Sequence, residues 1–481
     1  MHSVKGSFAD FIFPQHRTEL WIGLGILAVQ FICIKTLFPY AIITGDANQY
    51  IRTAANNVEL TAWPIGYPKF LEWVHLLAKG GWLLVTLQYI LLEGAILWFY
   101  FTVRYLLQPG KWVSRLIYFC LLMNPFILCI SNYAQTDSLF TALSVAWFTL
   151  ILWHLYKPRP VYIFGLVILA FLPWTIRYSA MFYPLITLPV ILFSGVRWWV
   201  KLSGVITGCL LFWGFVLYTE NLYQQLIGRK EFSPYSGWQL AGNALIMYRH
   251  IEHREADIPP PELLPLHQLV LHDLDNLPAP DQLPDKELHH FFTWKPISPL
   301  VRYCQAVYGT NPSTETLRKW ASAGQLYHKY GVFLIKRHPL AYFRYYGMAG
   351  VAWFISPDDA LTNVFPKGGV LTIDRSRDWF GYPSNWLPCS TSSLYSVTFI
   401  PVFANILNLL FILCIPGYFI CGCHRTASPL INKAVVTIAI YWLINFIFIV
   451  LSAPFQNRYG LPAMIFNTAF VPMLIERICK A

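Results

Sequence analysis

Charged residues are scarce in this sequence. Only 12% of its 481 residues are Asp, Glu, Lys or Arg, against roughly 25% in an ordinary soluble domain. Hydrophobic residues make up 56% of the chain, and its mean hydropathy is +0.46. A composition this poor in charge excludes a soluble enzyme and indicates a chain that lies mostly in lipid.

Other absences narrow the possible partners and cofactors. The formal net charge is +11, yet no run of five or more basic residues occurs, so we expect no nucleic-acid partner. None of the ten cysteines lies in a pair with zinc-finger spacing, so we predict no metal or other cofactor, and metal dependence stays open. Asn-x-Ser/Thr glycosylation sites are also missing, because Asn311 is followed by Pro312.

Long apolar runs are what the chain has instead. A helix needs about 20 apolar residues to cross a bilayer, and we predict ten crossings in an all-α polytopic membrane protein. Eight are single runs, and Val161–Phe193 forms a hairpin of two short helices with Arg177 at its tip. The single runs are Leu20–Ile43, Trp82–Val103, Val113–Ile130, Ser138–Tyr156, Leu202–Tyr218, Ser396–Ile420, Ala434–Leu451 and Gly460–Ile475.

The distribution of Lys and Arg predicts the orientation, because short cytoplasmic loops are enriched in both residues. With the N-terminus in the cytoplasm, the inside set is Lys5, Arg17, Arg104, Lys111, Arg115, Lys157, Arg159, Arg197, Lys201, Arg425, Lys433, Arg477 and Lys480. The short outside loops then hold only Arg52, Lys69, Lys79, Arg177 and Arg458. This asymmetry predicts a cytoplasmic N-terminus and a large loop on the outer face.

Three regions follow from these spans. Residues 1–220 form an N-terminal transmembrane module, 221–394 a mainly helical outer subdomain between the seventh and eighth spans, and 395–481 the C-terminal transmembrane helices. Within the subdomain, Ser313–Lys336 has helical periodicity and Pro259–Pro284 is expected to be irregular. The apolar segment 340–355 is short and aromatic, so we expect it to lie at the interface, with an eleventh span as the alternative. Pairing of Cys304 with Cys389 stays open.

The first outer loop, residues 44–73, holds the most informative pattern. Asp46 follows the first span, and a carboxylate at the membrane edge is a functional candidate. Asp46 and Tyr50 are four residues apart, so they share one face of a short surface helix. The turn Trp63-Pro-Ile-Gly-Tyr67-Pro then returns the chain toward the second span. A solvated loop aspartate is the plainer alternative.

Three further motifs fall on the same predicted face. Ser131-Asn-Tyr-Ala-Gln-Thr-Asp137 opens the fourth span, Arg177 lies at the hairpin tip, and Asn457-Arg458-Tyr459-Gly-Leu-Pro462 opens the last span. Simpler explanations exist for each charge. Asp137 would serve as a helix N-cap, and Arg177 and Arg458 would extend to the lipid headgroups.

Together these motifs resemble the C-type glycosyltransferase superfamily with its GT-C fold, in its aminoarabinose transferase and protein O-mannosyltransferase branches. The resemblance covers the membrane portion. Two departures stand out: the family's frequent Asp-Glu pair is Asp46-Ala47 here, and the Lys-Pro-Pro element of some relatives is Tyr67-Pro68-Lys69. The first departure leaves Asp46 as the only acid at that position.

The resemblance implies transfer of a sugar from a polyprenyl-phosphate donor to a glycan, lipid or protein acceptor, at the periplasmic face of a cell inner membrane. Asp46 would act as the general base or position the acceptor, assisted by Asp137. Arg177, Arg458 and Lys69 would bind the donor phosphate. Tyr50, Tyr67 and Tyr459 would contact the acceptor or the sugar.

Two other classes remain as alternatives. A transporter or flippase would carry ionisable residues inside its spans, and here these are chiefly Lys35 and Glu93. A polysaccharide polymerase or ligase would use paired arginines in a large loop, for which Arg375 and Arg377 are candidates. Because the candidate residues cluster at one membrane face, we favour interfacial chemistry.

Overall fold

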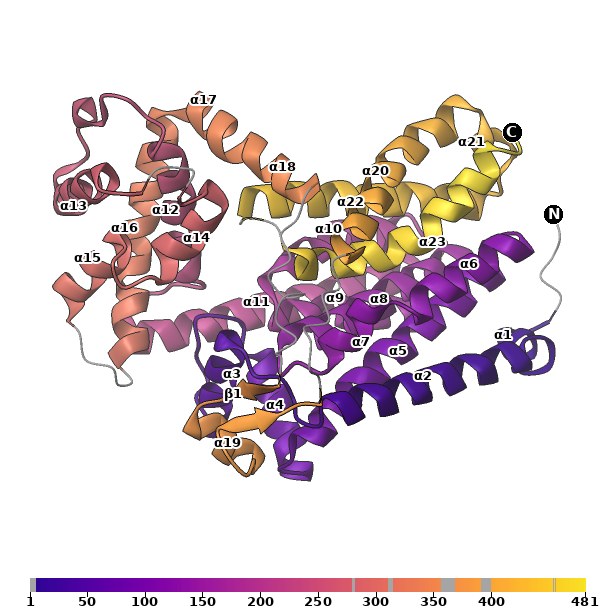
Figure 1. The fold of residues 1–481 in the computed structure, drawn as a ribbon. Coiled ribbons are helices and arrows are strands. Elements are labelled where there is room, and N and C mark those ends of the chain that lie inside the picture. The colour runs from indigo at the N-terminus through magenta and orange to yellow at the C-terminus, as the bar shows by residue number, and fades with distance from the viewer. Residues whose placement is uncertain are drawn as a thin grey trace.

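The protein is an almost entirely helical molecule whose long helices lie side by side (Figure 1). The structure is a computed structural model and describes residues 6–278, 282–309, 315–355, 368–390, 399–452, 454 and 456–481. The predicted boundary between 394 and 395 lies outside the described residues. Strands in the described part form one antiparallel pair, β1 (Gly369–Leu371) and β2 (Trp386–Pro388), with Val370 opposite Leu387.

Eight helical stretches are long and apolar enough to cross a membrane. They are α2 (Arg17–Leu37), α5 (Gly81–Leu106), α6 with α7 (Lys111–Leu122 and Pro125–Ser131), α8 (Thr136–Tyr156), α11 (Trp198–Ile227), α20 (Phe399–Ile420), α22 (Pro429–Ser452), and η7 with α23 (Asn457–Gly460 and Leu461–Ile478). Two shorter apolar helices, α9 (Pro160–Ile176) and α10 (Tyr183–Leu192), are joined by η2 (Tyr178–Phe182). The all-α polytopic class is thus confirmed, whereas ten crossings remain a prediction.

Proline shortens the first predicted span and divides the helix of the third, which remains one apolar stretch from Lys111 to Ser131. The first helix ends at Leu37 rather than Ile43, because Phe38 precedes Pro39 and the residue before a proline avoids the helical conformation. The third predicted span breaks at Asn124, whose side chain accepts a 3.0 Å hydrogen bond from the Phe126 backbone N–H and caps α7 at Pro125.

The other elements lie in the connections and at the ends of the chain. Near the N-terminus these are α1 (Phe8–Asp10), η1 (Phe11–Gln15), α3 (Gly45–Ala55) and α4 (Gly66–Leu77), and later come α19 (Asp374–Phe380) and α21 (Cys423–Thr426). Between α11 and β1 lie α12 (Tyr235–Tyr248), η3 (Arg254–Ala256), η4 (Pro261–Leu263), α13 (Leu264–Asp275), α14 (Asp285–Trp294), α15 (Pro299–Tyr308), α16 (Glu315–Arg337), α17 (Pro339–Ala341), η5 (Tyr342–Gly347) and α18 (Met348–Ile355).

Buried apolar residues form two cores. The larger core lies among the long helices, and the second joins residues between Trp238 and Tyr346. Helices α12 and α16 pack tightly within the second core, since a Cβ at Gly237 would overlap the carbonyl oxygen of Gly324. In Figure 1 this second group of helices lies at the end of the long helices opposite both termini.

The region between residues 259 and 355 differs in part from the sequence-based expectations. The stretch 259–284, expected to be irregular, contains α13, because Pro265 starts the helix and Leu266, Val270 and Leu274 repeat at four-residue intervals on its buried face. Cys304 is a free thiol whose Sγ lies 3.7 Å from the Lys319 carbonyl oxygen, so no bond to Cys389 is present. Segment 340–355 comprises α17, η5 and α18 and contacts both cores, and its depth in the membrane stays a prediction.

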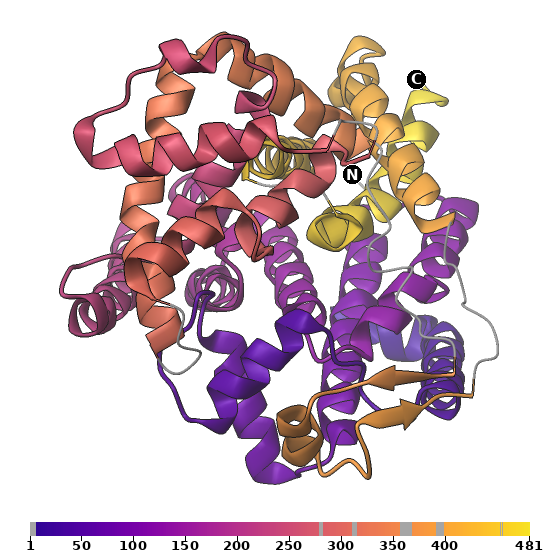
Figure 2. The same cartoon turned by 60° about the vertical axis from the view of Figure 1, so that its left-hand side comes forward.

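A late segment of the chain covers residues 44–73. In Figure 2 the β1–α19–β2 unit lies beside the indigo helices α3 and α4, away from the helices of the second core. Ser376 in α19 donates a 2.7 Å hydrogen bond to Asn48 in α3, and Trp379 stacks on His75 in α4 with ring centroids 3.8 Å apart. These contacts fix α3, and with it the residues at its N-terminal end.

Candidate active site

Two loops that are far apart in sequence are held together at the base of the site. The Ile42 backbone N–H donates to the Asn132 carbonyl at 2.8 Å, and the Ala134 N–H donates to the Ile42 carbonyl at 3.0 Å, forming a parallel bridge. Beyond the bridge, the Gln135 side-chain amide donates to the Thr44 hydroxyl. The start of α3 therefore lies beside the start of α8, which brings Asp46 close to Asp137.

Asp46 is the accessible acid of the pair. It lies in the first turn of α3, a helix that buries one face through Ala47, Tyr50, Ile51 and Ala54. The predicted surface helix is therefore present. The Asp46 side chain stays 42% exposed, and its Oδ2 atom is 3.4 Å from both Nη1 and Nη2 of Arg458. A carboxylate held this loosely remains free to contact a ligand.

Asp137 is the buried acid. Its side chain is 1% exposed in the first turn of α8, where Oδ1 forms an ion pair with Arg177. Its Oδ2 atom has no hydrogen-bond partner within the described part of the chain and lies 3.9 Å from Nη1 of Arg458. The N-cap residue of α8 is Gln135, so Asp137 does not cap the helix. Its carboxylate interacts with the two arginines instead.

The end of α9 points Arg177 inward. Its backbone is extended, with φ −145° and ψ 132°, which stops the helix after Ile176 and turns the side chain toward α8. The side chain is only 16% exposed, and its guanidinium lies 5.4 Å from the Phe140 ring and 5.0 Å from the Tyr459 ring. Arg177 therefore faces the site rather than the surrounding lipid.

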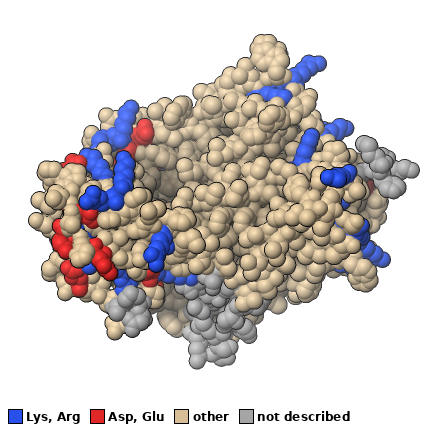
Figure 3. All heavy atoms as spheres, turned by 90° about the horizontal axis from the view of Figure 1, so that it is seen from above, with Lys and Arg blue, Asp and Glu red and all other residues tan. Residues whose placement is uncertain are grey.

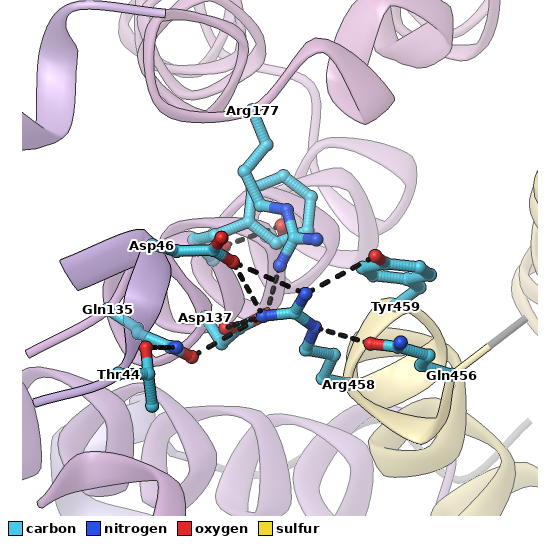
Figure 4. A network of polar contacts seen from close by, with 10 residues as sticks. Thr44, Asp46, Gln135, Asp137, Arg177, Gln456, Arg458 and Tyr459 are labelled. Carbon is cyan, nitrogen blue, oxygen red and sulfur yellow. Dashed lines mark hydrogen bonds and ion pairs between the residues drawn. The ribbon is translucent and has the colours of Figure 1, made fainter. Parts of the chain in front are cut away.

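Arg458 occupies the centre of the site (Figure 4). Besides its contacts with the two acids, its Nε donates to Gln456 Oε1 at 2.9 Å and its Nη1 lies 3.5 Å from Gln135 Oε1. Its guanidinium is 5.1 Å from the Tyr459 ring, which therefore lies against both arginines. The two guanidinium groups stay close because Asp137 lies between them and the ring face attracts both.

Tyr50 and Tyr67 form the floor beneath Asp46. Burial raises the pKa of Tyr50 and the Asp46 carboxylate raises it further, so the phenol stays protonated and able to donate. The two rings are 5.3 Å apart, edge to face. Tyr67 is completely buried, and its hydroxyl donates to Gln88 Oε1 at 2.8 Å, so it supports Tyr50 from below rather than lining the open side.

Lys69 lies apart from this cluster. Its Nζ atom is 2.9 Å from Glu72 Oε2 and donates to Asn57 Oδ1 at 3.1 Å, which ties α4 to the end of α3. The structure thus brings together Asp46, Asp137, Arg177, Arg458 and Tyr459, with Tyr50 beside them, and leaves Lys69 and Tyr67 outside the charged group.

Residues of α12 and α14 lie near Asp46 on the other side of the site. Burial raises the pKa of Tyr235, and Tyr459 and Asp46 raise it further. Burial lowers the pKa of His290, while Asp46 opposes that shift. Trp294, at the end of α14, lies 5.9 Å from Trp63, which precedes α4, ring to ring. Tyr235, Trp63 and Trp294 therefore form an aromatic surface next to Asp46.

The histidines in this region do not form a metal centre. Burial lowers the pKa of His289 to about 4, so it is neutral at pH 7, and its Nδ1 lies 3.0 Å from Asn243 Oδ1. His338 lies 2.6 Å from Asp257, away from the site. Across the described ranges, no group of three or more His, Cys, Asp or Glu side chains is arranged to hold a metal ion.

Sequence reasoning missed Gln135 and Gln456, which orient Arg458. Both lie within two residues of a predicted site residue, and this proximity was the available signal. Two of the residues named for the alternative functions are engaged elsewhere: Lys35 donates to Asn132 at 3.2 Å, and Arg377 pairs with Asp374 and Asp378 of its own helix.

Comparison with known proteins finds little. No protein-family model and no curated protein sequence matches the chain. Among solved structures, it is similar to the archaeal oligosaccharyltransferase AglB of Archaeoglobus fulgidus, in complex with an inhibitory peptide and a dolichol-phosphate, at 12% identity and a TM-score of 0.37. The match covers 95% of this chain and 50% of AglB, so the chain spans about half the length of that protein. A TM-score this low adds nothing to the functional interpretation.

Proposed function

We propose that the chain is an integral membrane glycosyltransferase that transfers a sugar from a polyprenyl-phosphate donor to an acceptor. The observation that carries this proposal is the convergence of Asp46, Asp137, Arg177 and Arg458 from four separate segments at one end of the long helices. Two arginines at a membrane edge suit a lipid phosphate, and an accessible carboxylate beside them suits an acceptor.

The arginines would bind the leaving phosphate. As the bond between the anomeric carbon and the phosphate oxygen breaks, negative charge grows on the phosphate, and fixed cations stabilise that charge. The contacts of Arg458 with Asp46 are long, at 3.4 Å, so phosphate oxygens compete with them readily. Arg177, held by buried Asp137, supplies a second cation whose position is fixed.

Asp46 would act on the acceptor. A hydroxyl acceptor gives its proton to the carboxylate while its oxygen bonds to the anomeric carbon, and the polyprenyl phosphate departs with the electron pair of the broken bond. The Tyr50 phenol, kept protonated by burial, is available to donate a hydrogen bond beside this carboxylate. The rings of Trp63 and Trp294 provide faces on which an acceptor is able to stack when it approaches from the side of α14.

Charge placement supports an outward-facing site. On the face seen in Figure 3, the end near the termini shows almost only Lys and Arg, the opposite end shows both signs, and the middle is nearly free of charge. We propose that the basic end is cytoplasmic, that the neutral middle lies in an inner membrane, and that the second core lies in the periplasm over the site.

Cysteine labelling tests this orientation. Cys421 and Cys479 are exposed at the basic end, so a membrane-impermeant maleimide should label them only after sealed, right-side-out membranes are permeabilised. Glu255, in the segment 221–394, is 75% exposed, and a cysteine replacing it should be labelled without permeabilisation. Immediate labelling of Cys421 and Cys479, with protection at position 255, would invert the proposed topology.

The donor site is tested by Arg458→Lys. Lysine keeps the charge but loses the two-pronged geometry that matches phosphate oxygens, so the KM for the polyprenyl-phosphate sugar should rise by roughly tenfold or more. The matched control is Arg52→Lys, in the last turn of α3, which should change the KM less than twofold. Equal donor KM values for Arg458→Lys and the unmodified protein would remove Arg458 from the donor site.

A further inference from the structure

A cavity lies at the end of the long helices that is far from the candidate active site. It has a volume of about 390 Å³ and is bounded by the ends of α8 and α10 and the beginning of α22. Its walls include His154, Lys433, Leu185, Pro189 and Ile440. Since α8 rises 1.5 Å per residue, His154 lies about 25 Å along the helix from Asp137. The cavity is thus near the opposite membrane surface, well away from the residues proposed for sugar transfer.

His154 is the unusual group in this cavity. It is 1% exposed, and within the described residues neither ring nitrogen has a hydrogen-bond partner. A neutral imidazole carries one N–H donor and one acceptor nitrogen, and leaving both unpaired in a buried position is costly. His154 belongs to the cavity wall, but both ring nitrogens are covered, so a ligand in the cavity pairs with the imidazole only when the ring turns toward it.

The cavity is polar at its mouth and apolar farther along α22. Lys433 and Asn432, in the first turns of α22, lie at its mouth with Ser194, and Lys201 is within electrostatic range of His154. Seven residues after Lys433, about 10 Å deeper along the helix, Ile440 belongs to an apolar wall completed from α10 by Leu185 and Pro189. Leu185 is 63% exposed and Ile440 45% exposed, so this wall opens toward the lipid chains.

We propose that this cavity is a specific site for one anionic glycerophospholipid. The phosphate lies at the mouth, where Lys433 supplies positive charge and His154 donates its N–H to a phosphate oxygen. One acyl chain follows the apolar wall of Leu185, Pro189 and Ile440 into the bilayer. A cation at the mouth with an apolar slot beneath it matches the order of charge and hydrocarbon in a phospholipid. The volume is within the roughly 300–1,000 Å³ of small-molecule sites.

Native mass spectrometry of the full-length chain in detergent, titrated with phosphatidylglycerol, phosphatidylcholine or polyprenyl phosphate, tests this site. Phosphatidylglycerol should bind at one copy per chain, roughly tenfold more tightly than phosphatidylcholine, whose headgroup carries no net charge. His154→Leu should weaken that binding roughly tenfold by removing the donor. Ile440→Trp should weaken it to a similar extent by filling the apolar slot while leaving every charge in place. Lys111→Gln, which removes a lysine at the same end outside the cavity, should leave it unchanged.

Two results would overturn the proposal. Equal binding of phosphatidylglycerol and phosphatidylcholine to the unmodified chain would mean that the cavity does not select lipids by the charge of their headgroups. Tighter binding of polyprenyl phosphate, lost in the same two variants, would assign the cavity to the donor lipid instead. The measurement on the unmodified chain stands even where a variant fails to fold, and it does not depend on sugar transfer.

Discussion

Replacing Asp46 with Asn is expected to lower the turnover of sugar transfer by roughly 100- to 10,000-fold, the contribution typical of a general base. The amide has nearly the same shape as the carboxylate but accepts no proton. Because Asp46 is 42% exposed and only loosely paired with Arg458, its loss should leave the fold unchanged. The measurement is the initial rate of product formation at saturating donor and acceptor, with donor KM determined in parallel.

Glu59→Gln is the matched control for this variant. Glu59 lies between α3 and α4 and accepts a 2.6 Å hydrogen bond from the Tyr218 hydroxyl, which a glutamine oxygen also accepts. Its turnover should stay within twofold of the unmodified protein. Retention of full activity by Asp46→Asn would exclude Asp46 as the base and leave the arginines without a catalytic partner.

Replacing Asp137 with Asn should act mainly on stability. The Asp137 side chain is 1% exposed and pairs with Arg177, which is 16% exposed. Removing one partner of a buried ion pair leaves the other charge uncompensated and costs about 3–5 kcal/mol. Here Arg177 and Arg458 would both lose a counter-charge. Thermal unfolding in detergent, followed by tryptophan fluorescence, should therefore show a clearly lower unfolding temperature.

The Asp46→Asn variant provides the comparison. It removes an equal charge from the same cluster at a half-exposed position, where an ion pair contributes little, so its unfolding temperature should stay close to that of the unmodified chain. If Asp137→Asn proved as stable as Asp46→Asn, Asp137 would not be the group that holds the two arginines together.

Local sequence signals predicted the helical class and the residues that converge. The apolar runs are long, and each candidate charge lies next to one of them. The resemblance to the C-type glycosyltransferases then singled out Asp46, Asp137, Arg177 and Arg458 among these charges. The end of α2 was misplaced because apolar residues continue past Pro39 to Ile43, and hydropathy does not register the backbone restriction that a proline imposes.

The pairing of these residues was not predictable in the same way. That Asp137 faces Arg177 while Asp46 stays open depends on the backbone bridge between Ile42 and Tyr133 and on the extended turn at Arg177. The bridge joins segments about 90 residues apart, and the turn depends on the backbone conformation of one residue. Local sequence spacing predicts neither of them. Tyr67 shows the same limit, since its burial beneath Tyr50 comes from packing on α5.

The most direct test of the central claim is chemical. The purified chain, in liposomes containing a lipid extract with polyprenyl-phosphate sugars, should convert donor to free polyprenyl phosphate, with a matching gain of sugar mass on an acceptor, as read by mass spectrometry. Asp46→Asn should leave the donor intact. Movement of intact donor from one leaflet to the other, with no loss of its sugar, would contradict a glycosyltransferase and indicate transport.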